Sequence, residues 1–211
     1  MARKRKSHSW TIAKILIGIV LAVVAYLGLT YGSLLKEMET ASQDYSRGDM
    51  EAALKRYETV EEKLRSFNAL RVIPAGDRHN LFLNQARMLY NMKQLNDAGE
   101  RLEKENEISG VTTDSRFFLL RGNINFKKAV TTYQQSTKKD ANLLEENLLG
   151  AEDSIRESLQ MEPGDWDAKY NYEFINNVRK MLTSKDSEKV KLLMEEEAKP
   201  QTKELPPELA G

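Results

Sequence analysis

The sequence has no cysteine among its 211 residues, and it has only two histidines. The absence of cysteine excludes disulfide bonds, thiol catalysis and cysteine-based metal sites, and it leaves the redox compartment undetermined. His8 lies in a basic leader and His79 lies at an expected loop, so the two are far apart in the chain. A histidine metal cluster is therefore excluded as well.

Motifs that carry chemistry are also missing. There is no glycine-rich phosphate loop, no Gly-x-Ser-x-Gly and no His-Glu-x-x-His. The acidic groups Glu145-Glu146 and 195–197 lie near lysines on charged helical faces, which indicates solvated surface rather than acid–base catalysis. Asp140 and Asn142, just before the first of these groups, suit helix capping better than a calcium site. We therefore expect no enzymatic activity, no cofactor and no small-molecule substrate.

Acidic residues are absent from the first 36 positions. Six of the 32 basic residues lie there, including the cluster Arg3–Lys6, so the zero formal net charge hides an asymmetry. From Glu37 onward the chain carries 26 basic and 32 acidic residues, a net charge of −6. A mildly acidic domain argues against a nucleic-acid partner, which requires a basic face.

One long apolar run, Ile15 to Tyr31, contains no charged residue. A helix needs about 20 apolar residues to span a hydrocarbon core, and Trp10–Lys14 can supply the first turn. We expect a basic cytoplasmic leader at 1–14 and a single transmembrane helix at 15–33, with Trp10, Tyr26 and Tyr31 at its interfaces. The positive-inside rule places the N-terminus in the cytoplasm and everything after Tyr31 outside it, at the cell membrane.

A cleaved signal peptide remains an alternative interpretation of this run, because Val23-Val24-Ala25 could serve as a cleavage site. A signal's apolar core is usually about 7–15 residues long. Here the apolar run continues past that site to Tyr31, which favours a retained anchor. The cationic cluster before the run argues against a buried core helix.

Residues 34–182 show helical periodicity, with apolar or small residues every three to four positions, and no strand pattern competes. Breaks are expected at 47–49, 71–77, 108–114, 131–139 and 161–165. The aspartates at these breaks suit helix N-caps: Asp49, Asp114, Asp140 and Asp165. Residues 183–211 are charged and contain Pro200, Pro206 and Pro207, which predicts a flexible tail, with 190–194 as a short helix at most.

Small residues recur at regular separations within this helical domain. The pairs are Ala41 and Ala53, Ala86 and Ala98, and Gly122 and Ala151, separated by 12, 12 and 29 residues. The first two separations resemble those of tetratricopeptide repeats, and the third implies an insertion. The resemblance implies an all-α fold in which the membrane helix is followed by a short solenoid of helical hairpins. An ordinary helical bundle with alanines placed by chance remains the alternative.

The stretch 165–173, Asp-Trp-Asp-Ala-Lys-Tyr-Asn-Tyr-Glu, follows Glu162-Pro-Gly. It resembles a segment of the membrane-anchored accessory proteins of the MxaK-like group, which are encoded with MoxR-type ATPases and von Willebrand factor A proteins. The resemblance implies an accessory role in assembling or maturing envelope proteins, with a von Willebrand factor A membrane protein as partner. From periodicity alone, the same segment predicts a packing stripe: Trp166, Tyr170, Phe174, Val178 and Met181.

Two function classes follow from these patterns. The first is a protein-binding scaffold, for which Tyr90, Tyr133 and Tyr172 are the candidate partner contacts. The second is a structural membrane protein that oligomerises through its long helices, especially 142–161, which has heptad-like apolar positions.

Overall fold

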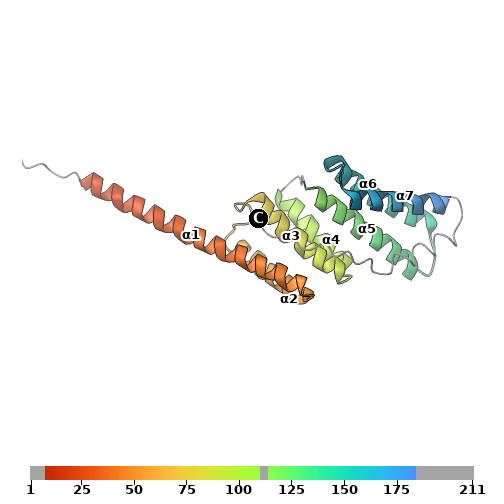
Figure 1. The fold of residues 1–211 in the computed structure, drawn as a ribbon, viewed down its shortest axis with the longest axis horizontal. Coiled ribbons are helices and arrows are strands. Elements are labelled where there is room, and N and C mark those ends of the chain that lie inside the picture. The colour runs from red at the N-terminus through yellow and green to blue at the C-terminus, as the bar shows by residue number, and fades with distance from the viewer. Residues whose placement is uncertain (1–7, 110–113, 184–211) are drawn as a thin grey trace, which may run out of the picture.

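The computed structural model describes residues 8–109 and 114–183 of the chain (Figure 1). Within these ranges the chain is all-α, as expected, and contains no strand. Its helices are α1 (His8–Ser46), α2 (Met50–Ser66), α3 (Ala75–Asn91), α4 (Leu95–Ser109), α5 (Ser115–Gln135), α6 (Ala141–Met161) and α7 (Trp166–Thr183). The predictions for the first seven residues and for the tail, including the short helix at 190–194, lie outside the described residues.

The membrane candidate and the first helix of the folded body form one continuous helix, α1, where the sequence analysis divides them at residues 33 and 34. From Trp10 onward this helix is long and apolar enough to cross a membrane, and its apolar window is not buried. Burial begins at Leu34 and continues through Met38 and Ala41. Gly32 and Ser33 do not break the helix, because no proline or cap follows them.

Consecutive helices pack as hairpins, α1 with α2, α3 with α4 and α5 with α6, and α7 lies against α6 (Figure 1). Gly48 forms the first turn with φ +86°, a left-handed conformation that glycine adopts without steric cost. Each expected aspartate cap accepts backbone N–H hydrogen bonds: Asp49, Asp114, Asp140 and Asp165.

Two expected loops are shorter in the structure. The 71–77 loop ends at Pro74, because α3 begins at Ala75 and takes Gly76 and Asp77 into its first turn. Proline just before a helix costs no hydrogen bond there, and an acid in the first turn favours the helix dipole. Likewise, α5 continues to Gln135, so most of the expected break at 131–139 is helical.

The core is divided into three clusters, and small residues lie inside each of them. Ala41 and Ala53 share the cluster of the first hairpin, and Ala86 and Ala98 share the cluster around α3 and α4. Ala151 is fully buried, and a Cβ placed on Gly122 would lie 3.0 Å from the Ala151 carbonyl oxygen. The small residues therefore permit close approach of the two helices in each hairpin.

Candidate partner-binding surface

Helix α7 carries two exposed aromatic residues. In the folded body, the loop after α2 exposes one more, Phe67. Trp166 and Tyr170 are one turn apart, and they are 79% and 52% exposed. Asp165 fixes the start of this helix by accepting hydrogen bonds from the N–H groups of Asp167 and Ala168 at 2.9 and 3.1 Å. The Lys169 ammonium lies 4.7 Å from the Trp166 ring centroid. Exposed aromatic side chains of this kind are typical of protein-binding surfaces.

The predicted packing role of Trp166 and Tyr170 is therefore wrong. Steps of four residues advance 400° around an α-helix, so each step drifts about 40° beyond a full turn. A stripe from Trp166 through Tyr170 and Phe174 to Val178 consequently rotates from solvent into the core. The buried face of α7 is instead made by Ala168, Ile175 and Val178.

The three predicted contact tyrosines are partly buried, and each ring is covered by a cation. The Lys127 ammonium lies 4.8 Å from the Tyr90 ring centroid, which joins α5 to α3. Lys139 covers Tyr133 at 5.3 Å, and the Arg156 guanidinium covers Tyr172 at 5.9 Å. Tyr133 and Tyr172 also pack against the cluster of α5, α6 and α7. In this structure these tyrosines pack within the folded body, whereas Trp166 and Tyr170 on α7 are more exposed.

Polar contacts join each odd-numbered helix to the next odd-numbered helix. The side chain of α1 Tyr31 donates to Asp77 of α3, and Asn91 of α3 donates to Tyr45 of α1 at 2.8 Å. The corresponding pairs further along are Arg116 with Asn80 at 3.3 Å, Lys127 with Tyr90, and Asn171 with Asn123 at 2.9 Å. These contacts place α1, α3, α5 and α7 side by side in one layer.

Two even-numbered helices, α2 and α4, are bridged as well. Arg101 of α4 donates to Glu61 and Glu58 of α2 at 2.7 and 2.9 Å. Glu61 is buried, and Arg101 is only 19% exposed, so this pairing is shielded from solvent. This pairing holds α4 beside α2, on the other side of the first two hairpins from α1 and α3.

A buried polar cluster at the start of α3 was not predicted as a group. Glu105 of α4 accepts a hydrogen bond from His79 Nδ1 at 2.7 Å and lies 3.5 Å from Arg78 Nε. In the sequence, Glu105 follows Ala98 and Leu102 at helical spacing, which places its carboxylate on the buried face of α4. Because Glu105 is almost fully buried, a substrate could not reach this pair, and its role is to hold α4 against α3.

Charges next to this cluster stabilise the start of α5. Burial opposes ionisation of Asp114, but hydrogen bonds from Arg116 outweigh it and lower the pKa of Asp114 below its ordinary value. Two of these hydrogen bonds come from the guanidinium, at 2.6 and 2.8 Å. Elsewhere in the core, burial raises the pKa of Tyr57 to about 12, although a hydrogen bond with Asn84 opposes the shift.

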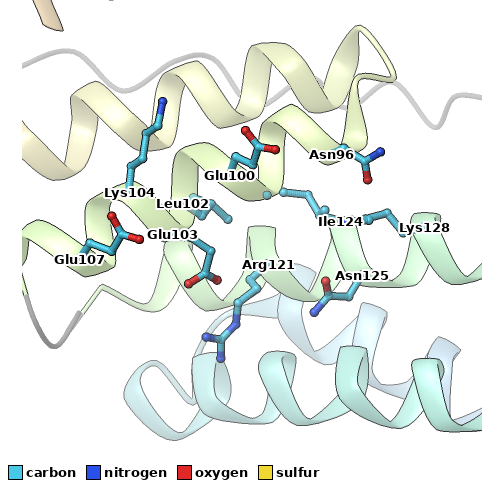
Figure 2. A pocket seen from close by; sticks show the side chains of 11 residues that line it. Asn96, Glu100, Leu102, Glu103, Lys104, Glu107, Arg121, Ile124, Asn125 and Lys128 are labelled. Carbon is cyan, nitrogen blue, oxygen red and sulfur yellow. The ribbon is translucent and has the colours of Figure 1, made fainter.

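A shallow groove of about 630 Å³ lies between α4 and α5 (Figure 2). Its α4 side carries Glu100, Glu103 and Glu107, and its α5 side carries Arg121 and Lys128. The charges are of both signs, and Arg121 is engaged by Glu157 at 2.6 Å. No nucleophile–base pair lines this groove. Within the described ranges, no group of three metal-binding side chains occurs.

Comparison with known proteins gives no relative. No protein family, no curated protein and no solved structure matches the chain.

Proposed function

We propose that this chain is a membrane-anchored scaffold that binds another protein through a short tetratricopeptide-like solenoid outside the cytoplasm. The observation that carries the proposal is the regular pairing of helices. Odd-numbered helices contact the next odd-numbered helix through polar pairs, and Arg101 bridges two even-numbered helices. A solenoid requires this arrangement, because each hairpin packs only on its neighbours in the stack.

The open end of such a stack supports a binding role. Terminal helices of solenoids need a polar outer face to remain soluble. On α7 that face carries Trp166 and Tyr170 beside Glu173, and both aromatic rings are largely accessible. A partner that covers these rings would remove their apolar surface from water, which favours association.

The resemblance of 165–173 to the MxaK-like group suggests what this partner is. Trp166 and Tyr170 belong to that stretch, so the likeness includes two exposed aromatic residues as well as the buried Ala168. A von Willebrand factor A membrane protein, working with a MoxR-type ATPase in assembly of envelope proteins, is the partner we propose. The apolar part of α1 would anchor the scaffold beside it, with the N-terminus in the cytoplasm.

Oligomerisation through α6 is less well supported. Its heptad-like residues Leu144, Leu148, Ala151 and Ile155 are buried against α5 and α7 of the same chain. They are not available to a second copy while the fold is intact.

Site-specific photo-crosslinking in cells that produce the full chain tests this function. A photoreactive amino acid replaces Trp166 or Tyr170, and a matched control replaces Lys180, which is exposed near the other end of α7. We expect one discrete adduct with a different membrane protein at 166 and 170, and none at 180. Adducts with a second copy of the chain, or equal adducts at all three positions, would refute the scaffold.

Topology is tested separately. A reporter that is active only outside the cytoplasm should be active when fused after Gly211, as the cation cluster before Ile15 predicts. Activity of a cytoplasm-only reporter there would reverse the orientation. N-terminal sequencing that begins at Tyr26 would show that the apolar segment is removed.

A further inference from the structure

The turn between α2 and α3 lies near the place where α1 leaves the folded body (Figure 1). Two apolar side chains of this turn are exposed. Phe67 is 67% exposed and Val72 is 83% exposed. These values are high for large apolar residues of a folded domain. The segment therefore presents apolar surface to something outside the body.

The position of this turn along α1 follows from ion pairs. Arg56 of α2 pairs with Asp44 and Glu37 of α1 at 2.6 and 2.7 Å. Arg56 therefore lies beside the middle of residues 37–44 of α1. From Arg56, α2 continues ten residues to Ser66, or about 15 Å. Because α1 runs in the opposite direction, the end of α2 is level with about Thr30.

The other end of the turn is fixed at the same level. Tyr31, the last residue of the apolar run, donates a hydrogen bond to Asp77 in the first turn of α3. Residues 67–74 therefore lie beside the point where the candidate membrane span ends.

The turn has an ordered backbone, so the exposure is a built feature. Leu70 is buried, and its carbonyl oxygen accepts a hydrogen bond from Arg78 at 3.1 Å. The Ala69 N–H donates to the Leu64 carbonyl at 2.8 Å, and Asn68 adopts φ +52°. With Leu70 held inward, Phe67 and Val72 are directed outward.

The charges within 63–76 have one sign, although Glu62 and Asp77 flank this segment. From Lys63 to Gly76 there are three cations, Lys63, Arg65 and Arg71, and no acid, although the domain as a whole is acidic. Arg65 is paired with Glu61 at 2.8 Å, while Arg71 is exposed next to Val72. Apolar side chains flanked by cations favour binding to the interface of a bilayer that contains anionic lipids.

We propose that the 67–74 turn is a second membrane contact, in which Phe67 and Val72 insert into the headgroup region of an anionic bilayer beside α1. Arg71 lies among the lipid phosphates. This contact rests on the proposed membrane anchor, since α1 brings the turn to the bilayer surface. It fixes the rotation of the folded body about α1 and hence the direction in which Trp166 and Tyr170 face.

Fluorescence quenching by lipids tests the contact. Because the natural chain has no cysteine, one introduced cysteine is labelled uniquely with an environment-sensitive fluorophore. The full chain is placed in vesicles of phosphatidylcholine and phosphatidylglycerol, some containing lipids with a shallow doxyl quencher. The label is carried by Val72→Cys, by Leu29→Cys within the span, or by Arg47→Cys at the far end of the first hairpin.

An inserted side chain lies about 5–10 Å into the interface, so emission from the label at 72 should fall by about half with doxyl lipid. Emission from 29 should fall at least as much, and emission from 47 should not change. In the Val72→Cys background, Phe67→Asp should abolish most of the quenching at 72.

Comparison of the labels at 29 and 72 distinguishes failure of the second contact from failure of the membrane anchor. If 29 is quenched and 72 is not, the second contact is overturned while the anchor stands. If 29 is not quenched, the anchor itself fails. If the label at 72 enters an apolar environment only at high protein density and doxyl lipid does not quench it, a second copy of the chain covers the turn. The lipid contact is then overturned.

Discussion

Replacing Gly122 with alanine tests how closely α5 and α6 pack. A Cβ at this position would lie 2.4 Å from Ile155 Cγ1, 3.1 Å from Ile155 Cδ1 and 3.0 Å from the Ala151 carbonyl oxygen. The first distance is far shorter than an ordinary contact, and the backbone oxygen cannot move aside as a flexible side-chain end can. The substitution therefore forces α5 and α6 apart.

Two effects oppose each other in this variant. Alanine in place of glycine inside a helix gains about 1 kcal/mol from helix propensity. Overpacking typically costs about 1–3 kcal/mol, and the 2.4 Å approach puts this site at the upper end of that range. We expect Gly122→Ala to lower the free energy of unfolding by about 1–2 kcal/mol, or Tm by about 3–6 °C.

Gly150→Ala is the matched control, because Gly150 is exposed in α6 and a Cβ there meets nothing within 4 Å. It should raise Tm by about 2–3 °C through helix propensity alone. The assay is circular dichroism at 222 nm on the full chain in mild detergent. In an Ile155→Ala background the part of the penalty that comes from the Ile155 side chain should disappear, while the part that comes from the Ala151 carbonyl oxygen should remain. Equal stabilisation by the two glycine variants would refute the close approach of α5 and α6.

The remaining predictions concern other positions. Trp166→Ala should change the free energy of unfolding by less than about 0.5 kcal/mol, because the ring is largely exposed; a loss of several kcal/mol in the same melting assay would return Trp166 to the core. Ala53→Leu and Ala151→Leu should each cost about 1–3 kcal/mol, since both residues are fully buried, and unchanged melting of both would contradict the hairpin packing. The pKa of Asp114 is lower in the folded chain than its ordinary value of 3.8, so at low pH the unfolded chain binds more protons. Asp114 should therefore stabilise the fold at pH values above 3.8, and this stabilisation should be lost as the pH falls below 3.8. The urea midpoints of unfolding at pH 6 and at pH 3 should differ less in Asp114→Asn than in the natural chain. An equal difference in the two proteins would exclude Asp114 as the source of this pH dependence.

The features that were predictable from sequence are those set within one turn of helix. Aspartate before a helical run satisfies free N–H groups wherever the helix packs, so the caps at Asp49, Asp140 and Asp165 could be read directly. The charge-free run before Leu34 is similarly local, because its length and composition do not depend on neighbours. Small residues such as Ala53 were identifiable because their size limits how helices can cross.

The features that were missed depend on which way a helix faces. The apolar residues of α7 include both a buried set and the exposed Trp166 and Tyr170, and a stripe drawn in steps of four crosses from one to the other. Only the contacts of Ala168 and Ile175 with α5 and α6 decide the orientation. The pairing of Glu105 with His79 was missed for a similar reason, since the two residues lie on different helices.

The continuity of α1 connects a local feature, the apolar run, with a tertiary one, the orientation of the folded body. Because no flexible linker separates Tyr31 from Leu34, the tilt and rotation of the apolar part of α1 are transmitted to the folded body. The hydrogen bond between Tyr31 and Asp77 and the ion pairs of Arg56 brace α1 against α3 and α2 on either side of that junction. A rigid junction of this kind holds a binding surface at a fixed height and direction above a bilayer. It therefore suits a scaffold whose partner is held in the same membrane, because both proteins then meet with most of their rotational freedom already removed.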